Sequence, residues 1–285
     1  MFSPRAAWAT PCCKKVVFSP ARHGQCIVST FKTFSTFFKT DPLLSTLTKD
    51  VVEEFLLTSF KRTKYGASHY YRTLKAAFNR AKDWGYINDN PFVKIKLPKI
   101  PENKPLFITE DEFEELIKIE TIDIYKSIFT VGFFTGCRLG ELLHLQWDDI
   151  DFQRNEISVK NKEKFTTKSK RERLIPMSKQ VQSVLSKINE TTQIKSPENY
   201  IFCDSKGNPF PNSRISKAFK NLIKKSSLPP KLHFHSLRHS FCSNLVSKGV
   251  SIYVVKQLAG HESILTTQRY AHLKQQALID AIDLF

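Results

Sequence analysis

Residues 231–249, KLHFHSLRHSFCSNLVSKG, join an apolar helical pattern to an arginine and three histidines. Leu237, Phe241 and Leu245 recur every four residues, which predicts one face of a helix. Arg238 lies three residues before Phe241, so its side chain borders that buried face. A charge beside a core is unfavourable unless an anion meets it. The stretch therefore predicts a helix that presents an arginine to an anionic partner.

Two further polar islands interrupt apolar sequence, at residues 135–147 (TGCRLGELLHLQW) and 258–273 (LAGHESILTTQRYAHL). In the first, Arg138 follows a glycine that ends one helix and precedes the next helix. In the second, His261 stands before a short helix that carries Tyr270. Helix N-termini offer free N–H groups and a favourable dipole, and arginine adds bidentate hydrogen bonds. Arginines at helix starts with histidines beside them therefore indicate a phosphate-binding site.

The charge balance indicates the same kind of partner. Among 285 residues, 44 Lys and Arg oppose 27 Asp and Glu, which gives a net charge of +17. Such an excess favours a polyanion, nucleic acid first and an anionic membrane surface second. Hydrophobic residues make up 41% of the chain, enough for a real core.

The sequence predicts neither a membrane span nor a metal site. No apolar run reaches about 18 residues, and the first residues lack a stretch of the signal-peptide type. The six cysteines are scattered, without the paired spacing of a zinc site. Because thiols stay reduced inside cells, we expect a cytoplasmic protein.

The first part of the chain is predicted to be helical. Residues 1–25 show no clear period and stay unassigned, whereas 26–97 carry amphipathic patterns. Thr48 is predicted to cap a helix that starts at residue 49. The apolar positions are Phe31, Phe34 and Phe38 in one helix, and Tyr71, Leu74, Phe78 and Ala81 in another, residues 68–85.

Basic side chains of that last helix lie largely off its apolar stripe: Arg72, Lys75, Arg80 and Lys82. They form either a solvated face or a DNA-binding face. Prolines among lysines follow over residues 98–107, which predicts a stiff, extended linker between two domains.

The second part, residues 108–285, is predicted to be mostly helical with a small sheet. Thr109 and Glu112 have capping-box spacing, and a helix over 124–135 should stop at Gly136. Strands at 156–160 and 173–177 flank a charged turn, which predicts a hairpin with a basic tip. Ser178 should cap the next helix. Further helices are predicted near 213–225, 236–248, 252–259, 264–271 and 274–283. The predicted fold class is mainly α with a small antiparallel β-sheet.

Five motifs follow one another along the chain: TGCRLGELLHLQWDDID, TTKSKRERLIPM, HSLRH, LAGH and TTQRY. Together they resemble the tyrosine recombinase (phage integrase) family, over roughly residues 26–285. The resemblance implies a helical core DNA-binding domain at 26–97, the linker at 98–107 and an α+β catalytic domain at 108–285. It implies double-stranded DNA as the partner and integration or excision of a mobile element as the task.

The resemblance also assigns roles. Tyr270 matches the nucleophile, and the other catalytic positions are Arg138, Lys168, His235, Arg238 and His261, supported by Glu141 and His239. Lys168 shares its loop with Lys164 and Lys170, so the assignment among the three stays open. His239, taken alone, is more typical of a packing histidine than of one in direct chemistry.

The implied reaction is a transesterification. Attack by Tyr270 would make a 3′-phosphotyrosine and free a 5′-hydroxyl, with Lys168 protonating the leaving oxygen. The two arginines would neutralise the phosphate and favour the tyrosine phenolate. Because the phosphotyrosine stores the bond energy, neither ATP, a metal nor another cofactor is needed.

The segment after the nucleophile is amphipathic, with apolar Leu273, Leu278, Ile279, Ile282 and Leu284. The resemblance implies that such a tail packs on a neighbouring protomer and links a homotetramer on paired DNA sites; packing on its own domain is the alternative. Accessory directionality proteins are possible further partners.

Three alternatives stay open. A type IB topoisomerase-like enzyme would share the same residue set, and a DNA-binding relative could have lost its chemistry. The third is a metallohydrolase that uses His233, His235 and His239, although no carboxylate stands at a helpful spacing.

Overall fold

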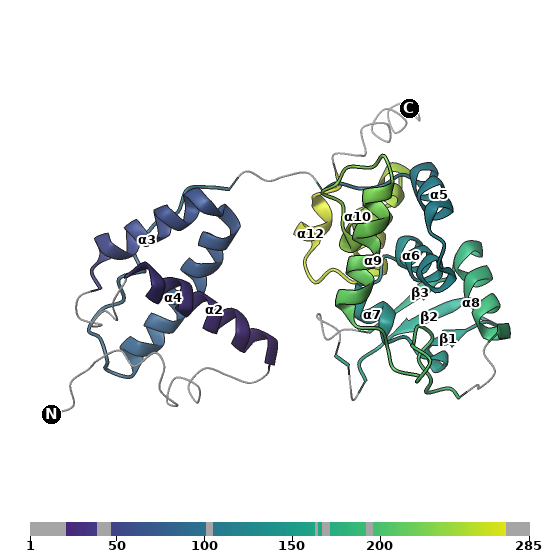
Figure 1. The fold of residues 1–285 in the computed structure, drawn as a ribbon, viewed down its shortest axis with the longest axis horizontal. Helices are drawn as coiled ribbons and strands as arrows, with labels where there is room; N and C mark the ends of the chain where they lie inside the picture. Colours follow the sequence, from purple (N-terminus) through teal and green to yellow (C-terminus); the bar gives the residue numbers. More distant parts are fainter. Residues whose placement is uncertain are drawn as a thin grey trace. The chain divides into compact units, whose positions relative to one another are not determined.

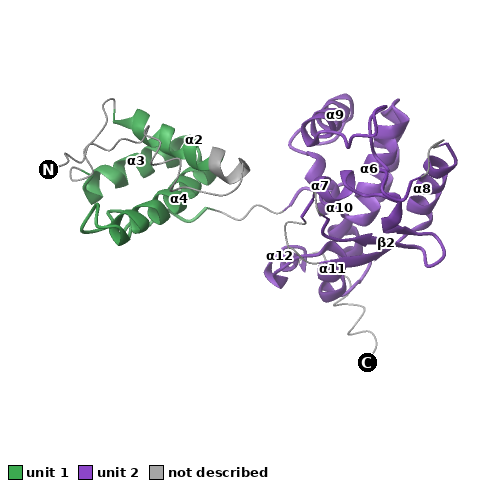
Figure 2. Cartoon of the chain, turned by 90° about the horizontal axis from the view of Figure 1, so that it is seen from below, with its two compact units in different colours: residues 1–102 green, residues 103–285 purple. Residues whose placement is uncertain are grey.

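The computed structural model describes residues 21–38, 47–100, 105–162, 165–166, 172–191 and 196–271. The chain forms two compact units, residues 1–102 and 103–285, coloured separately in Figure 2. Lys168, Lys164, Lys170, residues 1–20 and the tail from residue 272 lie outside the described residues. Among the residues that are described, no helix is both long and apolar enough to cross a membrane.

Unit 1 is built from three labelled helices, α2 (Ala21–Phe37), α3 (Lys49–Arg62) and α4 (Lys64–Asp83) (Figure 1). Helix α2 begins inside the segment that the sequence left unassigned. Its phenylalanines pack on α3 and α4, with the Phe34 and Phe55 ring centroids 4.9 Å apart. The buried core of the unit is Phe34, Leu47, Val52, Phe55, Leu56, Leu74, Phe78, Phe92 and Ile95.

In unit 1, helix α3 starts at Lys49 as predicted, whereas the capping of α3 and the start of α4 differ from the prediction. Thr48 occupies the N-cap position of α3, but its side chain makes no capping hydrogen bond. Helix α4 begins at Lys64, four residues early, because the Thr63 hydroxyl accepts a hydrogen bond from the Gly66 N–H at 3.2 Å. A polar residue thus starts the helix before its apolar stripe begins.

Unit 2 opens with α5 (Glu110–Ile119), α6 (Asp123–Thr135) and α7 (Leu139–Leu143). The capping box of Thr109 and Glu112 is confirmed, and α6 ends at Gly136 as predicted. Helix α6 is apolar on most of its surface and lies in the middle of the unit (Figure 1). Its buried side chains, Ile128, Phe129, Val131 and Phe133, join the large core.

The sheet is short and lies between helices. After the 3₁₀ turn η2 (Trp147–Asp149), strands β1 (Ile150–Asp151), β2 (Glu156–Val159) and β3 (Arg173–Pro176) pair antiparallel in that order. Ile157 pairs with Ile175, so both apolar side chains enter the core. The predicted strands and their hairpin pairing are confirmed.

Four of the remaining helices follow the prediction closely: α8 (Lys179–Thr191), α9 (Asn212–Lys225), α10 (Phe234–Ser247) and α11 (Ile252–Ala259). Helix α12 (Ile264–Gln268) is shorter than predicted. Tyr270 therefore lies after this helix instead of on it. Its N–H bonds to the Thr267 carbonyl, three residues back, and the tighter turn directs the ring into a small core with Phe241 and Val255.

Candidate active site

Two glycines at helix ends hold the two predicted arginines. Gly136 ends α6 and Gly260 ends α11, both in the left-handed conformation, with φ of 63° and 66°. Arg238 donates from Nη1 to the Gly136 carbonyl at 2.8 Å, and Arg138 donates from Nη2 to the Gly260 carbonyl at 3.3 Å. Residues from all three polar islands therefore meet in unit 2.

Glu141 is the buried carboxylate between two arginines. Its Oε1 accepts from Arg138 Nη1 at 2.7 Å, and its Oε2 accepts from Arg173 Nη2 at 2.7 Å. Burial alone would raise the pKa of Glu141, but the hydrogen bonds and charges of Arg173 and Arg138 outweigh it and hold the pKa below its ordinary value. The carboxylate stays ionised and fixes the position of Arg138.

Arg238 is buried, with 3% of its surface exposed, and makes no salt bridge with any described carboxylate. Its Nη2 is buried and bonds to no described group. Burial and the nearby charge of Arg138 lower the pKa of Arg238 to about 10, which still leaves it a cation at neutral pH. A buried cation without a salt bridge to any described carboxylate is suited to an anionic substrate.

His261 is buried beside both arginines. Burial lowers its pKa to about 3, and the charges of Arg238 and Arg138 contribute, so the ring is neutral. Its Nδ1 lies 2.9 Å from the hydroxyl of Thr267, which can donate to it and leave the ring proton on Nε2. His261 can then donate a hydrogen bond from Nε2.

Tyr270 is buried, with 2% of its surface exposed. Burial raises the pKa of its phenol, the nearby Cys242 thiol adds to the rise, and the charges of Arg238 and Arg269 offset only part of it. The charge of Arg238 favours the phenolate, as predicted, but its effect on the pKa is smaller than that of burial. The phenol keeps its proton because desolvation outweighs the attraction of the cations.

The Tyr270 hydroxyl lies 2.6 Å from Nδ1 of His239, the next residue after Arg238 on α10. His235, one turn earlier, is exposed, and its ring meets that of His239 edge-on at 5.0 Å. The structure thus brings His239, which the sequence placed among supporting residues, into contact with the predicted nucleophile.

The hairpin that carries Lys168 is fixed at its base. Phe165 stacks on the ring of His144, with centroids 4.4 Å apart. Lys162 exchanges backbone hydrogen bonds with Phe165 and pairs with Asp149 at 2.5 Å. These contacts tie the described part of the hairpin to α7 and η2, close to Arg138 and Glu141.

Comparison with known proteins identifies the family. The model of the phage integrase family matches residues 106–277. The chain belongs to the phage integrase family. The predicted family and the predicted class of enzyme, a tyrosine recombinase that breaks and rejoins DNA, are confirmed.

Relatives of this integrase-family chain span most of its length. A tyrosine recombinase of Thermosipho africanus is 31% identical over 241 residues, which cover 81% of this chain and 82% of that protein. The tyrosine recombinase XerC of Oceanobacillus iheyensis is 27% identical over 263 residues, which cover 87% and 84%.

Solved structures share the fold. The Tn1549 transposon integrase in complex with transposon right end DNA matches with a TM-score of 0.80 at 20% identity, over 95% of this chain and 96% of that one. The XerH site-specific recombinase bound to difH substrate matches with a TM-score of 0.71 at 20% identity, over 95% and 81%. The predicted fold class is confirmed.

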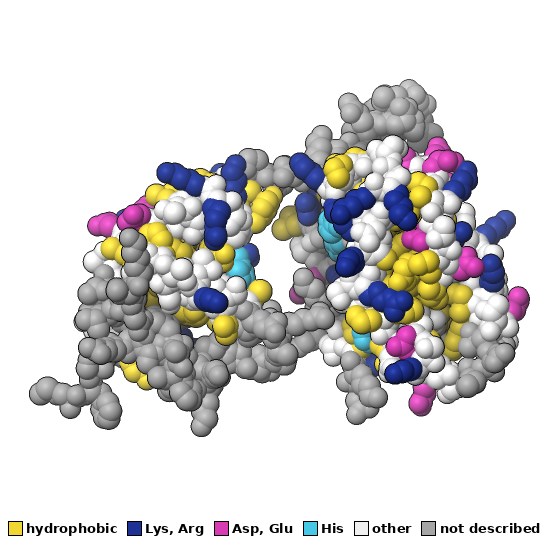
Figure 3. All heavy atoms as spheres, viewed as in Figure 1, with side chains coloured by type: hydrophobic (Ala, Val, Ile, Leu, Met, Phe, Trp, Pro, Cys, Tyr) yellow, Lys and Arg dark blue, Asp and Glu magenta, His cyan; other side chains and the backbone are white. Residues whose placement is uncertain are grey.

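Basic side chains surround the site of this family member. Figure 3 shows Lys, Arg and His side chains gathered on the visible face of unit 2, over the region where Figure 1 draws α10 and α12. The described residues hold no group of three His, Cys, Asp or Glu side chains that could bind a metal ion, and this includes the histidines of α10.

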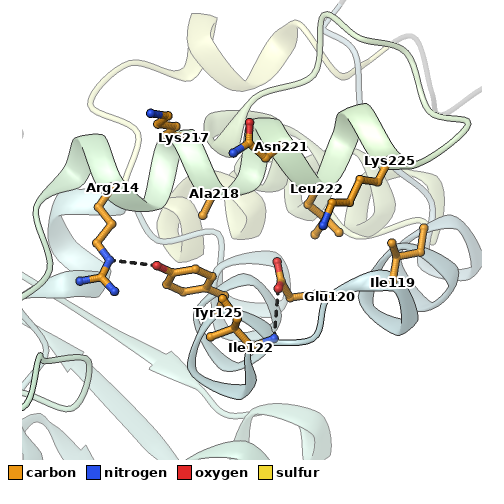
Figure 4. Close-up of a pocket in the computed structure, with 10 residues that line it drawn as sticks. All are labelled: Ile119, Glu120, Ile122, Tyr125, Arg214, Lys217, Ala218, Asn221, Leu222 and Lys225. Carbon is orange, nitrogen blue, oxygen red and sulfur yellow. Dashed lines mark hydrogen bonds between the residues drawn. The ribbon is translucent and has the colours of Figure 1, made fainter.

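A separate pocket of about 310 Å³ lies between α9 and the segment that joins α5 to α6 (Figure 4). Across it, Arg214 Nε donates to the Tyr125 hydroxyl at 2.9 Å. The catalytic candidates among the described residues do not line this pocket. Arg138, Arg238, His261 and Tyr270 instead make their hydrogen bonds in another part of the unit.

The sequence prediction missed Arg173 and Thr267. Arg173 lies in β3, with its Nε donating to the Leu258 carbonyl at 3.0 Å and its Nη2 to Glu141. The sequence did show a charged residue at the start of the apolar run RLIP. The pattern alone, however, is equally consistent with an exposed residue at the end of a strand. Thr267 had no signal, because its role depends on where His261 lies.

Proposed function

We propose that this chain is a site-specific recombinase that cleaves and rejoins duplex DNA through a covalent bond to Tyr270. The observation that carries the proposal is the meeting of Arg138, His261 and Tyr270 near the buried guanidinium of Arg238, which forms no salt bridge with a described carboxylate. A phosphodiester is the anion that would neutralise it.

The arginines have the largest part in this reaction. As Tyr270 attacks, negative charge builds on the non-bridging phosphate oxygens, and Arg138 and Arg238 would donate to those oxygens. His261 Nε2 would add a third donor. Donors fixed where charge develops accelerate a reaction by ~10²–10³-fold each. Glu141 keeps Arg138 in place and is itself held by its ion pair with Arg173.

The leaving group needs a proton. Attack at phosphorus forms the Tyr270 Oη–P bond and breaks the bond to the 5′ oxygen, which leaves a 3′-phosphotyrosine. Lys168 is the proposed acid for that oxygen, and His235 is proposed to supply a hydrogen bond or a base near the attacking oxygen. Rejoining is the same exchange in reverse, so no ATP enters the balance.

Unit 1 has the proposed role of a core DNA-binding domain over residues 26–97. On α4, Arg72 and Arg80 are exposed, and Lys75 lies against the ring of Tyr71. Lys82 already pairs with Asp89 at 2.9 Å. Contacts of such side chains with phosphates would supply affinity and fall steeply with salt.

The proposed assembly is a homotetramer on two DNA sites, linked through the amphipathic tail after residue 272. Its proposed task is integration or excision of a mobile element in the cytoplasm, with accessory proteins setting the direction. Two observations support this proposal. The tail has an apolar pattern, and the fold is shared with the Tn1549 transposon integrase and the XerH site-specific recombinase.

Covalent trapping tests the proposal. The protein is incubated with nicked DNA fragments from the ends of the host element, with chelator and without ATP, and products are separated in SDS. We expect a protease-sensitive protein–DNA adduct with the wild type and none with Tyr270→Phe, which keeps the ring and removes only the hydroxyl.

The alternatives give different results in the same assay. No adduct together with salt-sensitive DNA binding would identify a DNA-binding relative without chemistry. An adduct combined with supercoil relaxation by the monomer at any sequence would identify a topoisomerase. Loss of activity in chelator would favour the metallohydrolase.

A further inference from the structure

The hydrogen bond between Tyr270 and His239 involves the atom that reacts. The Tyr270 Oη is the proposed nucleophile, and the nitrogen 2.6 Å from it is Nδ1 of His239. This distance is short for a hydrogen bond between oxygen and nitrogen. The two rings come from segments 31 residues apart, and their centroids are 6.0 Å apart.

The surroundings of His239 decide which group holds the proton. Burial lowers its pKa to about 4, with contributions from His235, Arg269, His233 and Arg238. The imidazole is therefore neutral, and the phenol beside it is protonated. It follows that Tyr270 donates and Nδ1 accepts, so that the proton of the ring is on Nε2.

We propose that His239 positions the Tyr270 hydroxyl and accepts its proton during DNA cleavage. This rests on the proposed function, because it assumes that Tyr270 attacks a phosphodiester. The phenol proton moves from Oη to Nδ1 as the Oη–P bond forms, and the 5′ oxygen leaves with a proton from Lys168. Imidazolium and neutral lysine remain, and rejoining returns both protons.

The geometry gives this role a physical basis. A phenol that is buried and protonated is a weak nucleophile, so its proton must leave as the new bond forms. Nδ1 of His239 is already hydrogen-bonded to the hydroxyl, so it can accept the proton without a rearrangement of the site. The other groups that face His239 are cationic or neutral: His233, His235 and Arg238 on its own helix, Arg269 beside Tyr270, and His261 before α12. An incoming phosphate would counter these positive charges and make the imidazole more basic.

Three substitutions separate positioning from proton transfer. His239→Asn places an amide near the position of Nδ1, where it accepts the hydrogen bond of the phenol but cannot take up its proton. His239→Leu removes both functions with a side chain of similar size. His233→Asn is the matched control, since His233 lies at the N-cap of the same helix and bonds to Ser236, and asparagine is a good N-cap.

The readout is the rate of covalent adduct formation on nicked DNA in single turnover, from pH 4 to pH 9, with DNA affinity measured in parallel. We expect both His239 variants to bind DNA normally and to cleave about 10²-fold more slowly or worse, the usual contribution of a general base. The wild-type rate should fall on the acid side as His239 takes up a proton, and this limb should be missing in His239→Asn. The His233→Asn control should keep the wild-type rate at neutral pH and retain the acid limb.

Other results would overturn the inference. If His239→Asn cleaves like the wild type while His239→Leu is slow, His239 only positions the tyrosine and accepts no proton. If both variants cleave like the wild type, it has neither role. Absence of an adduct with the wild type itself would contradict the proposed function instead, so the two failures are distinguishable.

Discussion

Arg173 Nη2 lies 2.7 Å from Glu141 Oε2, and both side chains are almost entirely buried. This ion pair joins strand β3 to helix α7. Since Glu141 also bonds to Arg138, the pair is one step away from the proposed phosphate site. The buried pair of Arg173 and Glu141 thus positions Arg138 without itself contacting the phosphate.

Removing Arg173 should therefore impair both stability and cleavage. Arg173→Met leaves Glu141 buried with one partner fewer, which we expect to cost on the order of 3 kcal/mol in the free energy of unfolding. The double variant Arg173→Met, Glu141→Gln removes both charges of the buried pair and should recover part of this stability, although Arg138 loses its carboxylate partner. Its cleavage should stay slow, because Arg138 loses its orienting carboxylate. Urea titration and adduct formation measure the two effects, and full activity of the double variant would contradict the positioning role.

Gly260 should tolerate no side chain. Its φ of 66° is strained for other residues, and a Cβ there would lie 2.9 Å from Arg173 Nη1. Gly249 is a matched control, with a φ of 84° and no atom within 4 Å of its Cβ position. We expect Gly260→Ala and Gly249→Ala both to lose roughly 1–2 kcal/mol through backbone strain, but only Gly260→Ala to slow cleavage. Equal cleavage rates in the two variants would argue against a role of the Gly260 turn.

The stack of Phe165 on His144 should affect protonation of the leaving group. Phe165→Ala removes the stack on His144, and we expect cleavage to slow by about 10-fold because the hairpin no longer holds the proposed acid, Lys168, in place. A substrate with sulfur at the 5′ bridging position has a better leaving group that needs no protonation. This substrate should restore most of the rate to Phe165→Ala and to Lys168→Ala. An undiminished defect would mean that Phe165 acts on another step.

Stability should fall in mild acid. The pKa of His261 lies near 3 and that of His239 near 4 in the folded protein, below the ordinary histidine value of 6.5. The unfolded chain therefore binds more protons, and the free energy of unfolding decreases as pH falls from about 6.5 towards 4. Above about pH 7.5, where these histidines are neutral in the unfolded chain as well, they contribute no slope. Urea midpoints measured across this range should decline for the wild type and decline less for His261→Asn; parallel curves would contradict the assignment.

Charge removal on α4 should weaken DNA binding without affecting the fold. We expect Arg72→Gln and Arg80→Gln each to reduce the slope of log affinity against log salt by about one, as the loss of one phosphate contact does. Lys82→Gln should have a smaller effect, since that lysine pairs with Asp89. Lys187→Gln, an exposed lysine of α8, is the control. Unchanged slopes in the two arginine variants would mean that the basic face of α4 is exposed to solvent and does not bind DNA.

Much of the fold was predictable because its signals are local. The capping box of Thr109 and Glu112, the glycine that ends α6 and the alternation of β2 each depend on neighbours in the chain. The start of α4 at Lys64 was not predicted, because its capping residue, Thr63, lies outside the apolar pattern.

The sequence by itself determined which residues could bind and cleave a phosphodiester, because motif spacing reports residue type and order. Only the tertiary structure decided how they combine. Arg173 became a partner of Glu141, and His239 a partner of Tyr270, because packing brings separate segments to within hydrogen-bond distance. Burial is likewise a property of the folded chain, and it is the reason why the Tyr270 phenol keeps its proton beside two arginines.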